Sequence, residues 1–83
     1  MKKTLFTPEY AKLIEWLKEA RAERGLTMRE LAVKLDVPHS YVGKVEQCER
    51  KLDVLEYVRY CEALGVKPTV GISILMMKNR ISK

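Results

Sequence analysis

Polar and basic side chains gather on one side of a short predicted helix that begins at about Pro38. Val42 and Val45, three residues apart, would point inward from this helix. The outward side is small, polar and basic, and it consists of His39, Ser40, Gly43 and Lys44. A helix that is apolar on the inside and hydrogen-bonding on the outside suits insertion into the major groove of DNA.

The chain shows no residue grouping typical of catalysis or of metal binding. It has no nucleophile with a base beside it and no glycine-rich phosphate loop. Cys48 and Cys61 are far apart and there is one histidine, which argues against a zinc site or a disulfide framework. We therefore expect free thiols, no enzyme activity, no cofactor, no metal and no small-molecule ligand.

A preceding helix, joined by a tight turn, would hold the helix that bears these polar side chains. Thr27 is a good N-cap, and Glu30 three residues later completes a capping box. Asp36 would end this helix, because aspartate tolerates a left-handed backbone better than most residues. The inward face is predicted to consist of Leu31, Ala32 and Leu35. The small side chain of Ala32 would let the two helices approach closely.

The stretch from Thr27 to Glu46 resembles the helix-turn-helix of the lambda-repressor-like (Xre/Cro-type) DNA-binding domains. The resemblance extends over roughly Leu13 to Val66, through the segments ARAERGLTMRELA, VPHSYVGKVE and ERKLDVLEYVRYCEALGV in the family's order and spacing. It implies an all-α, compact five-helix fold in which the second and third helices form the motif. Residues 1–83 would make one domain, with its core at about 7–66.

The resemblance also implies which residues would contact DNA. The positions that would read bases in the major groove are Pro38, His39, Ser40, Gly43 and Lys44. The positions that would contact phosphates are Arg29, Tyr41, Gln47 and Lys51. Lys44 can donate to guanine O6 and N7, and Gly43 would permit a close approach of the helix backbone to DNA.

Three positions depart from the family's pattern. Met28 stands where relatives often carry a glutamine that contacts phosphate, and Pro38 replaces the usual Ser or Thr cap. Cys48 stands where relatives usually have glycine, so either the backbone is strained there or the helix exit has changed. A redox role for Cys48 is an alternative, because basic neighbours would lower the pKa of its thiol. Arg50 is expected to pair with Glu46, with phosphate contact as the alternative.

Helices are also predicted on both sides of the motif. The first begins at Thr7-Pro8-Glu9, and its buried stripe consists of Tyr10, Leu13, Ile14, Leu17 and Ala20. After the motif, Asp53 caps a helix with Glu56 as its capping-box partner. The core face of that helix is predicted to consist of Val54, Val58, Cys61 and Leu64, with Tyr57 and Tyr60 at the core edge. Gly25 and Gly65 would end these two helices in a left-handed conformation.

Residues 67–83 carry signals for both a strand and a helix. The alternation of Val70, Ile72 and Ile74 with small residues favours a strand. The position of Pro68 and the family's usual fifth helix favour a helix, which is our prediction. Its apolar residues would surround nearly the whole helix, which indicates a subunit interface. The predicted interface consists of Val70, Ile74, Leu75, Met77 and Ile81.

The bulk properties are consistent with a nucleic-acid partner. The formal net charge is +5 and the sequence pI is about 9.4, which favours a polyanionic partner. The sequence has neither the apolar run of a signal peptide nor the ~20 apolar residues needed to span a bilayer. We therefore expect a soluble, cytoplasmic protein with no membrane partner.

Two functions are compatible with the sequence. The leading hypothesis is a sequence-specific, double-stranded DNA-binding transcriptional regulator, a homodimeric repressor that binds an inverted-repeat operator through the third helix. The alternative is a protein-interaction module, such as an antitoxin-like or adaptor subunit, that retains the fold with weak or no DNA binding. Glu46 and Glu49 near the binding face, together with the missing glutamine, favour the alternative.

Overall fold

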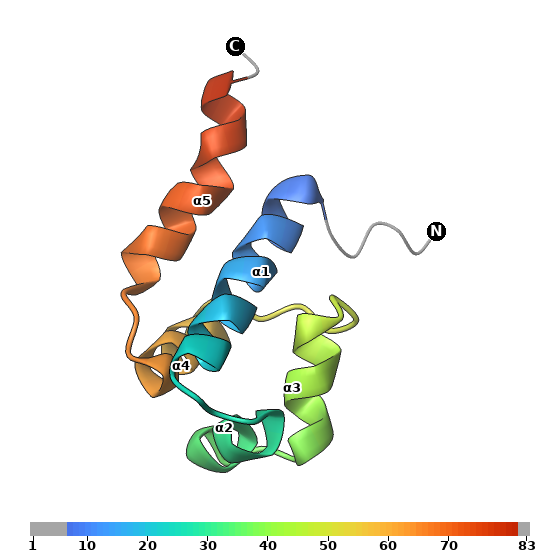
Figure 1. The fold of residues 1–83 in the computed structure, drawn as a ribbon. Helices are drawn as coiled ribbons and strands as arrows, with labels where there is room; N and C mark the ends of the chain where they lie inside the picture. Colours follow the sequence, from blue (N-terminus) through green and yellow to red (C-terminus); the bar gives the residue numbers. More distant parts are fainter. Residues whose placement is uncertain (1–6, 82–83) are drawn as a thin grey trace.

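Five α-helices follow one another along the chain (Figure 1). The computed structural model describes residues 7–81, and side chains of residues 7–77. The helices are α1 (Pro8–Glu23), α2 (Met28–Leu35), α3 (His39–Glu46), α4 (Val54–Leu64) and α5 (Pro68–Ile81). Within residues 7–81 there is no strand, so the all-α prediction is confirmed, including the helical choice for the C-terminal segment.

Local side-chain bonds begin three of these helices as predicted. The Thr7 hydroxyl accepts a hydrogen bond from the Tyr10 N–H at the start of α1. Thr27 with Glu30, and Asp53 with Glu56, form complete capping boxes at the starts of α2 and α4. The predicted left-handed backbone is present at Asp36, Gly25 and Gly65, with φ angles of 60°, 71° and 74°. These ends are therefore encoded by neighbouring residues.

The buried core joins α1 to the motif and to α4. Its members are Leu13, Ile14, Leu17, Ala20, Leu31, Ala32, Val42, Val45, Tyr57, Tyr60, Cys61 and Leu64. The predicted core face of α4 was wrong at its N-terminal end, because Val54 is 80% exposed. Tyr57 and Tyr60, predicted at the core edge, are buried instead. The Tyr57 hydroxyl donates to the Pro68 carbonyl at 2.6 Å, so this polar group has a hydrogen-bond partner although the ring is buried.

A glycine allows α5 to lie close against α1 (Figure 1). A Cβ at Gly71 would lie 2.7 Å from Leu13 Cδ1 and from Trp16 Cζ3, and closer still to the Tyr57 hydroxyl. Such distances are too short for real atoms, so a side chain at this position would force Leu13, Trp16 or Tyr57 to shift. The absence of a side chain at Gly71 thus allows the close contact between α5 and α1.

No helix within residues 7–81 has both the length and the apolar character required to cross a bilayer.

Candidate nucleic-acid interface

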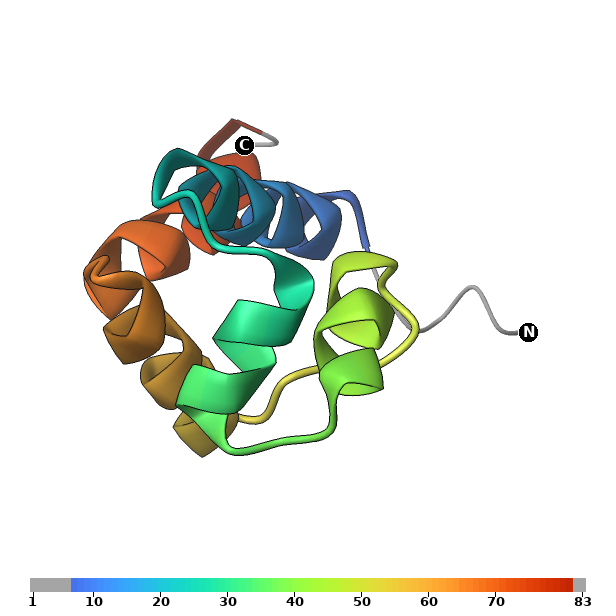
Figure 2. The same cartoon turned by 60° about the horizontal axis from the view of Figure 1, so that its bottom comes forward.

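The predicted base-reading residues other than Gly43 lie together on the exposed side of α3 and its N-terminal end. Figure 2 shows α2 and α3 side by side, with α3 along one edge of the molecule. Val42 and Val45 are fully buried and anchor α3 to the core. The side chains of His39, Ser40 and Lys44 are exposed and form no hydrogen bond or ion pair with any residue that the structure describes. These three groups are therefore free to bind another molecule, while contact with DNA stays a prediction.

Proline supports the first turn of α3 without a side-chain cap. Pro38 occupies the N-cap position with φ −61° and ψ 148°, and no side chain accepts the free N–H groups there. Its carbonyl accepts from the Tyr41 N–H at 3.0 Å, which starts the helix. Pro38 is exposed beside His39, and its contact with DNA stays a prediction.

Met28 covers Gly43 from the neighbouring helix. A Cβ at Gly43 would lie 3.8 Å from Met28 Sδ, an ordinary van der Waals contact. The contact between α2 and α3 therefore does not require glycine here, unlike the contact at Gly71. The close approach of Gly43 to DNA remains a separate prediction. Met28, which stands in place of the expected glutamine, is 38% exposed and presents a thioether where an amide was expected.

A partly buried ion pair holds the inner side of α3 against α1. Arg21 Nε donates to Glu46 Oε2 at 2.5 Å, and Arg21 NH2 donates to Glu46 Oε1 at 3.1 Å. Arg21 NH1 also donates to the Leu26 carbonyl at 2.8 Å, so one guanidinium joins α1, the turn before α2, and α3. The Glu46 side chain is 3% exposed. The hydrogen bond to Glu46 raises the pKa of Arg21 above its ordinary value.

The predicted pairing of Arg50 with Glu46 was therefore wrong. Glu46 lies on the side of α3 that faces α1, whereas Arg50 follows the helix exit and points to the start of α4. Its NH2 pairs with Glu56 Oε2 at 2.5 Å, and its guanidinium lies 4.8 Å from the centre of the Tyr41 ring. Sequence reasoning missed Arg21, although its place four residues after Leu17 puts it beside the buried stripe of α1.

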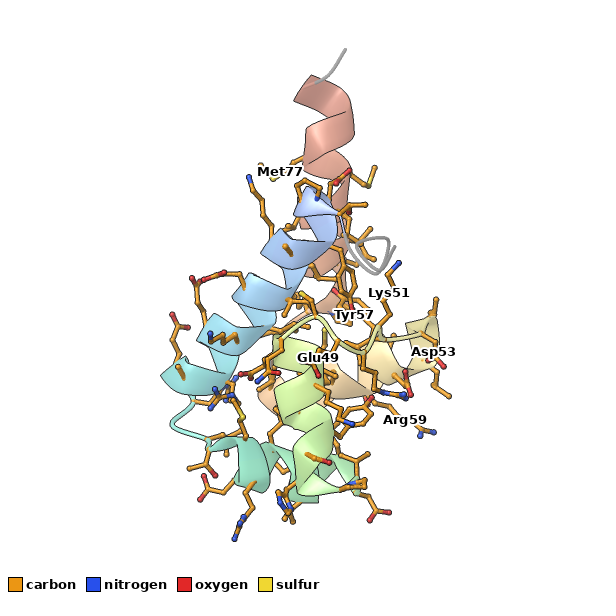
Figure 3. The ribbon with its side chains drawn as sticks, turned by 90° about the vertical axis from the view of Figure 1, so that its right-hand side faces the viewer. Glu49, Lys51, Asp53, Tyr57, Arg59 and Met77 are labelled. Carbon is orange, nitrogen blue, oxygen red and sulfur yellow. The ribbon has the colours of Figure 1, made fainter. Side chains whose placement is uncertain are left out.

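The predicted phosphate contacts divide between two ends of the motif. Arg29 is exposed in the first turn of α2. Tyr41, Gln47 and Lys51 belong to α3 and its exit, and Lys51 Nζ lies 5.8 Å from the centre of the Tyr10 ring. Tyr41 is half-buried, and burial is the main cause that raises the pKa of its phenol. Figure 3 shows Glu49 and Lys51 on the loop after α3, with their side chains apart.

Of the two alternatives for the helix exit, a strained backbone or a changed exit, Cys48 adopts the strained backbone. Its φ angle is 61°, in the left-handed region, and its N–H donates to the Val45 carbonyl at 3.0 Å. The alternative that basic neighbours lower the pKa of this thiol was wrong. The side chain is half-buried, and burial raises the pKa of the Cys48 thiol.

The predicted interface residues of α5 do not share one surface. Val70 and Met77 are exposed, Ile74 is half-buried, and Leu75 packs against the core. Ile74 and Met77 face α1, whereas Leu75 faces the start of α4. The side chain of Ile81 lies outside the described residues. Whether these residues contact a second subunit stays a prediction.

Comparison with known proteins identifies the family. A family model described as helix-turn-helix matches residues 17–70, which include α2 and α3. An XRE-family-like protein from Pseudomonas syringae pv. tomato str. DC3000 is 39% identical, with a TM-score of 0.80 over 92% of this chain and 93% of that chain.

The wild-type restriction-modification controller protein C.Esp1396I shares the fold at 23% identity, with a TM-score of 0.74 over 94% of this chain and 100% of that chain. No curated protein sequence shows significant similarity to the chain. The helix-turn-helix geometry and these matches together place the chain in the lambda-repressor-like, Xre-type helix-turn-helix family.

Proposed function

We propose that this protein is a sequence-specific regulator of transcription that binds double-stranded DNA through α3 in the major groove. The observation that carries the proposal is the division of α3 into two sides. Buried valines and the Arg21–Glu46 pair hold one side, while His39, Ser40 and Lys44 are unbonded on the other. A rigid helix with free donors and acceptors suits direct reading of base edges.

Phosphate contacts from both ends of the motif would set the orientation of α3 in the groove. Arg29 would bind the backbone from the start of α2, and Tyr41, Gln47 and Lys51 from the exit of α3. Arg50 joins this group, because Glu56 and the Tyr41 ring already hold its guanidinium beside α3. The net charge of +5 would add a salt-dependent attraction that does not depend on sequence.

Homodimerisation would give the protein enough contacts to select an operator. One helix-turn-helix reads only a few base pairs, whereas two related by a twofold axis reach successive major grooves about 34 Å apart. We place the pairing seam on α5 and the first turn of α4. Of the residues predicted from the sequence, Ile74 and Met77 are left out of this seam because they face α1. Four apolar side chains are exposed there, namely Val54, Leu55, Ile72 and Met76. Val54, Ile72 and Leu75 line one hollow of about 130 Å³, so the surfaces of the two helices are continuous.

By occupying an inverted-repeat operator, such a dimer would repress a promoter by occlusion. The alternative role as a protein-interaction module loses one support, because the Glu46 carboxylate faces Arg21 and does not add negative charge to the binding face. Glu49 remains exposed on the loop after α3.

Selection of bound sequences from a random duplex pool, followed by gel-shift titration at several salt concentrations, tests the proposal. Lys44→Ala should weaken specific binding by ~1–3 kcal/mol and relax the preference at one base position. Lys51→Ala should instead weaken binding to all sequences alike and reduce the salt dependence. An unchanged motif and affinity for Lys44→Ala would show that the assigned reading face is wrong. A selected motif without twofold symmetry would refute the dimeric arrangement.

A further inference from the structure

A second apolar surface lies between α1 and α5, away from α3. A groove of about 550 Å³ runs between these helices. Its apolar wall consists of Ala11, Trp16, Ile74 and Met77. In Figure 1 the upper parts of α1 and α5 lie at the opposite end of the molecule from α2, and Figure 3 shows Met77 beside the N-terminal half of α1. The groove would therefore stay accessible while α3 occupies DNA.

The rim of this groove carries two glutamates and one lysine, whereas the whole chain has a positive net charge. Glu15 and Glu19 line the groove one helical turn apart on α1, together with Lys12. Both glutamates are exposed, and neither has a hydrogen bond or an ion pair with the residues that the structure describes. Since the whole chain carries a net charge of +5, two adjacent free carboxylates mark this rim as locally negative.

Trp16 gives the groove an anchor point. Its ring packs beside Gly71, which holds the side chain in place. The ring also lines the groove and is half-buried, so part of it is open to a ligand. Its indole N–H has no acceptor among the residues that the structure describes. A fixed aromatic ring with a free donor is the kind of group that contributes strongly to protein–protein contacts.

We propose that the α1–α5 groove binds an amphipathic helical segment of another protein, with apolar side chains against Trp16 and Met77 and lysine or arginine against Glu15 and Glu19. The apolar wall and the two glutamates of the rim lie side by side. The apolar face of such a helix can therefore contact the wall while its basic face contacts the glutamates. The seam at Ile72 and Val54 is on the other side of α5. The proposal does not depend on DNA binding.

Fluorescence of the intact protein tests this assignment directly, because Trp16 is the single tryptophan of the chain. The probe is a helical peptide with leucine on one face and lysine on the other, and its twin carries glutamate in place of lysine. The basic peptide should shift the Trp16 emission saturably, and the acidic twin should not. Glu15→Lys combined with Glu19→Lys should weaken binding of the basic peptide roughly tenfold. Glu23→Lys, on the same helix but outside the groove, is the matched control.

Sedimentation then separates this groove from the pairing seam. Met77→Ser should leave the homodimer intact, whereas Ile72→Ser should weaken it. Equal binding of both peptides, no binding of the basic peptide, or equal loss of affinity in Glu23→Lys would overturn the proposal. Dissociation of the homodimer by Met77→Ser would also overturn it, because the groove would then be a contact between copies.

Discussion

Breaking the Arg21–Glu46 pair should destabilise the protein far more than a surface ion pair would. Glu46→Gln retains the shape of the side chain but leaves a partly buried guanidinium without its carboxylate. Loss of one partner from a buried pair costs roughly 3–5 kcal/mol. Arg21 keeps its hydrogen bond to the Leu26 carbonyl and a side chain that is 15% exposed, so we expect about 2–3 kcal/mol. In a domain of this size, that loss lowers the melting temperature by roughly 10–20 °C.

A double-mutant cycle identifies the partner of Glu46. Arg21→Met combined with Glu46→Gln should cost much less than the sum of the single changes, because the two side chains interact directly. Arg50→Met is the matched control, since Arg50 pairs with Glu56, and its effect should simply add to that of Glu46→Gln. Thermal unfolding followed by circular dichroism measures all five variants. Coupling of Glu46 to Arg50, or a cost for Glu46→Gln below about 1 kcal/mol, would refute the reasoning.

Three further changes probe the backbone and the buried phenol groups. Gly71→Ala should destabilise the fold by roughly 1–3 kcal/mol through collision with α1, whereas Gly43→Ala should fold normally. Equal melting temperatures for these two variants would contradict the close contact at Gly71. Cys48→Gly should be neutral or stabilising by at most about 1 kcal/mol, and a clear drop in denaturant midpoint would show that packing of the thiol outweighs strain. Burial raises the pKa of the phenol groups of Tyr57 and Tyr60. Above about pH 10 these phenols ionise in the unfolded chain but not in the folded one, so the free energy of unfolding should fall as pH rises. Tyr57→Phe should reduce this loss of stability in melts at alkaline pH.

The sequence was sufficient to predict features that depend on neighbouring residues. The capping boxes at Thr27 and Asp53, and the left-handed residues Asp36 and Gly65, all involve groups within a few positions of one another. Such signals need no knowledge of tertiary packing, and the structure confirms each of them. At Cys48 the family's glycine left two alternatives, a strained left-handed backbone or a changed helix exit, and the structure shows the first.

Features that depend on distant residues were not predicted. Glu46 finds its partner 25 positions away on α1, whereas sequence reasoning chose a nearby arginine. On α4, apolar spacing treated Val54 as a core residue and the tyrosines as edge residues. Tyr57 is buried because its hydroxyl reaches the Pro68 carbonyl on another helix, and the pattern of apolar residues contains no information about that bond.

The organisation of α3 separates stability from recognition. Val42, Val45 and Glu46 make the contacts that hold the helix, and all three side chains are almost fully buried. His39 and Lys44 contribute no hydrogen bond or ion pair to the part of the fold that the structure describes. Substitutions at these exposed positions should therefore change which sequence is bound with little change in melting temperature, because surface changes away from packed groups cost little. A helix built in this way can acquire a new specificity while its support is unchanged.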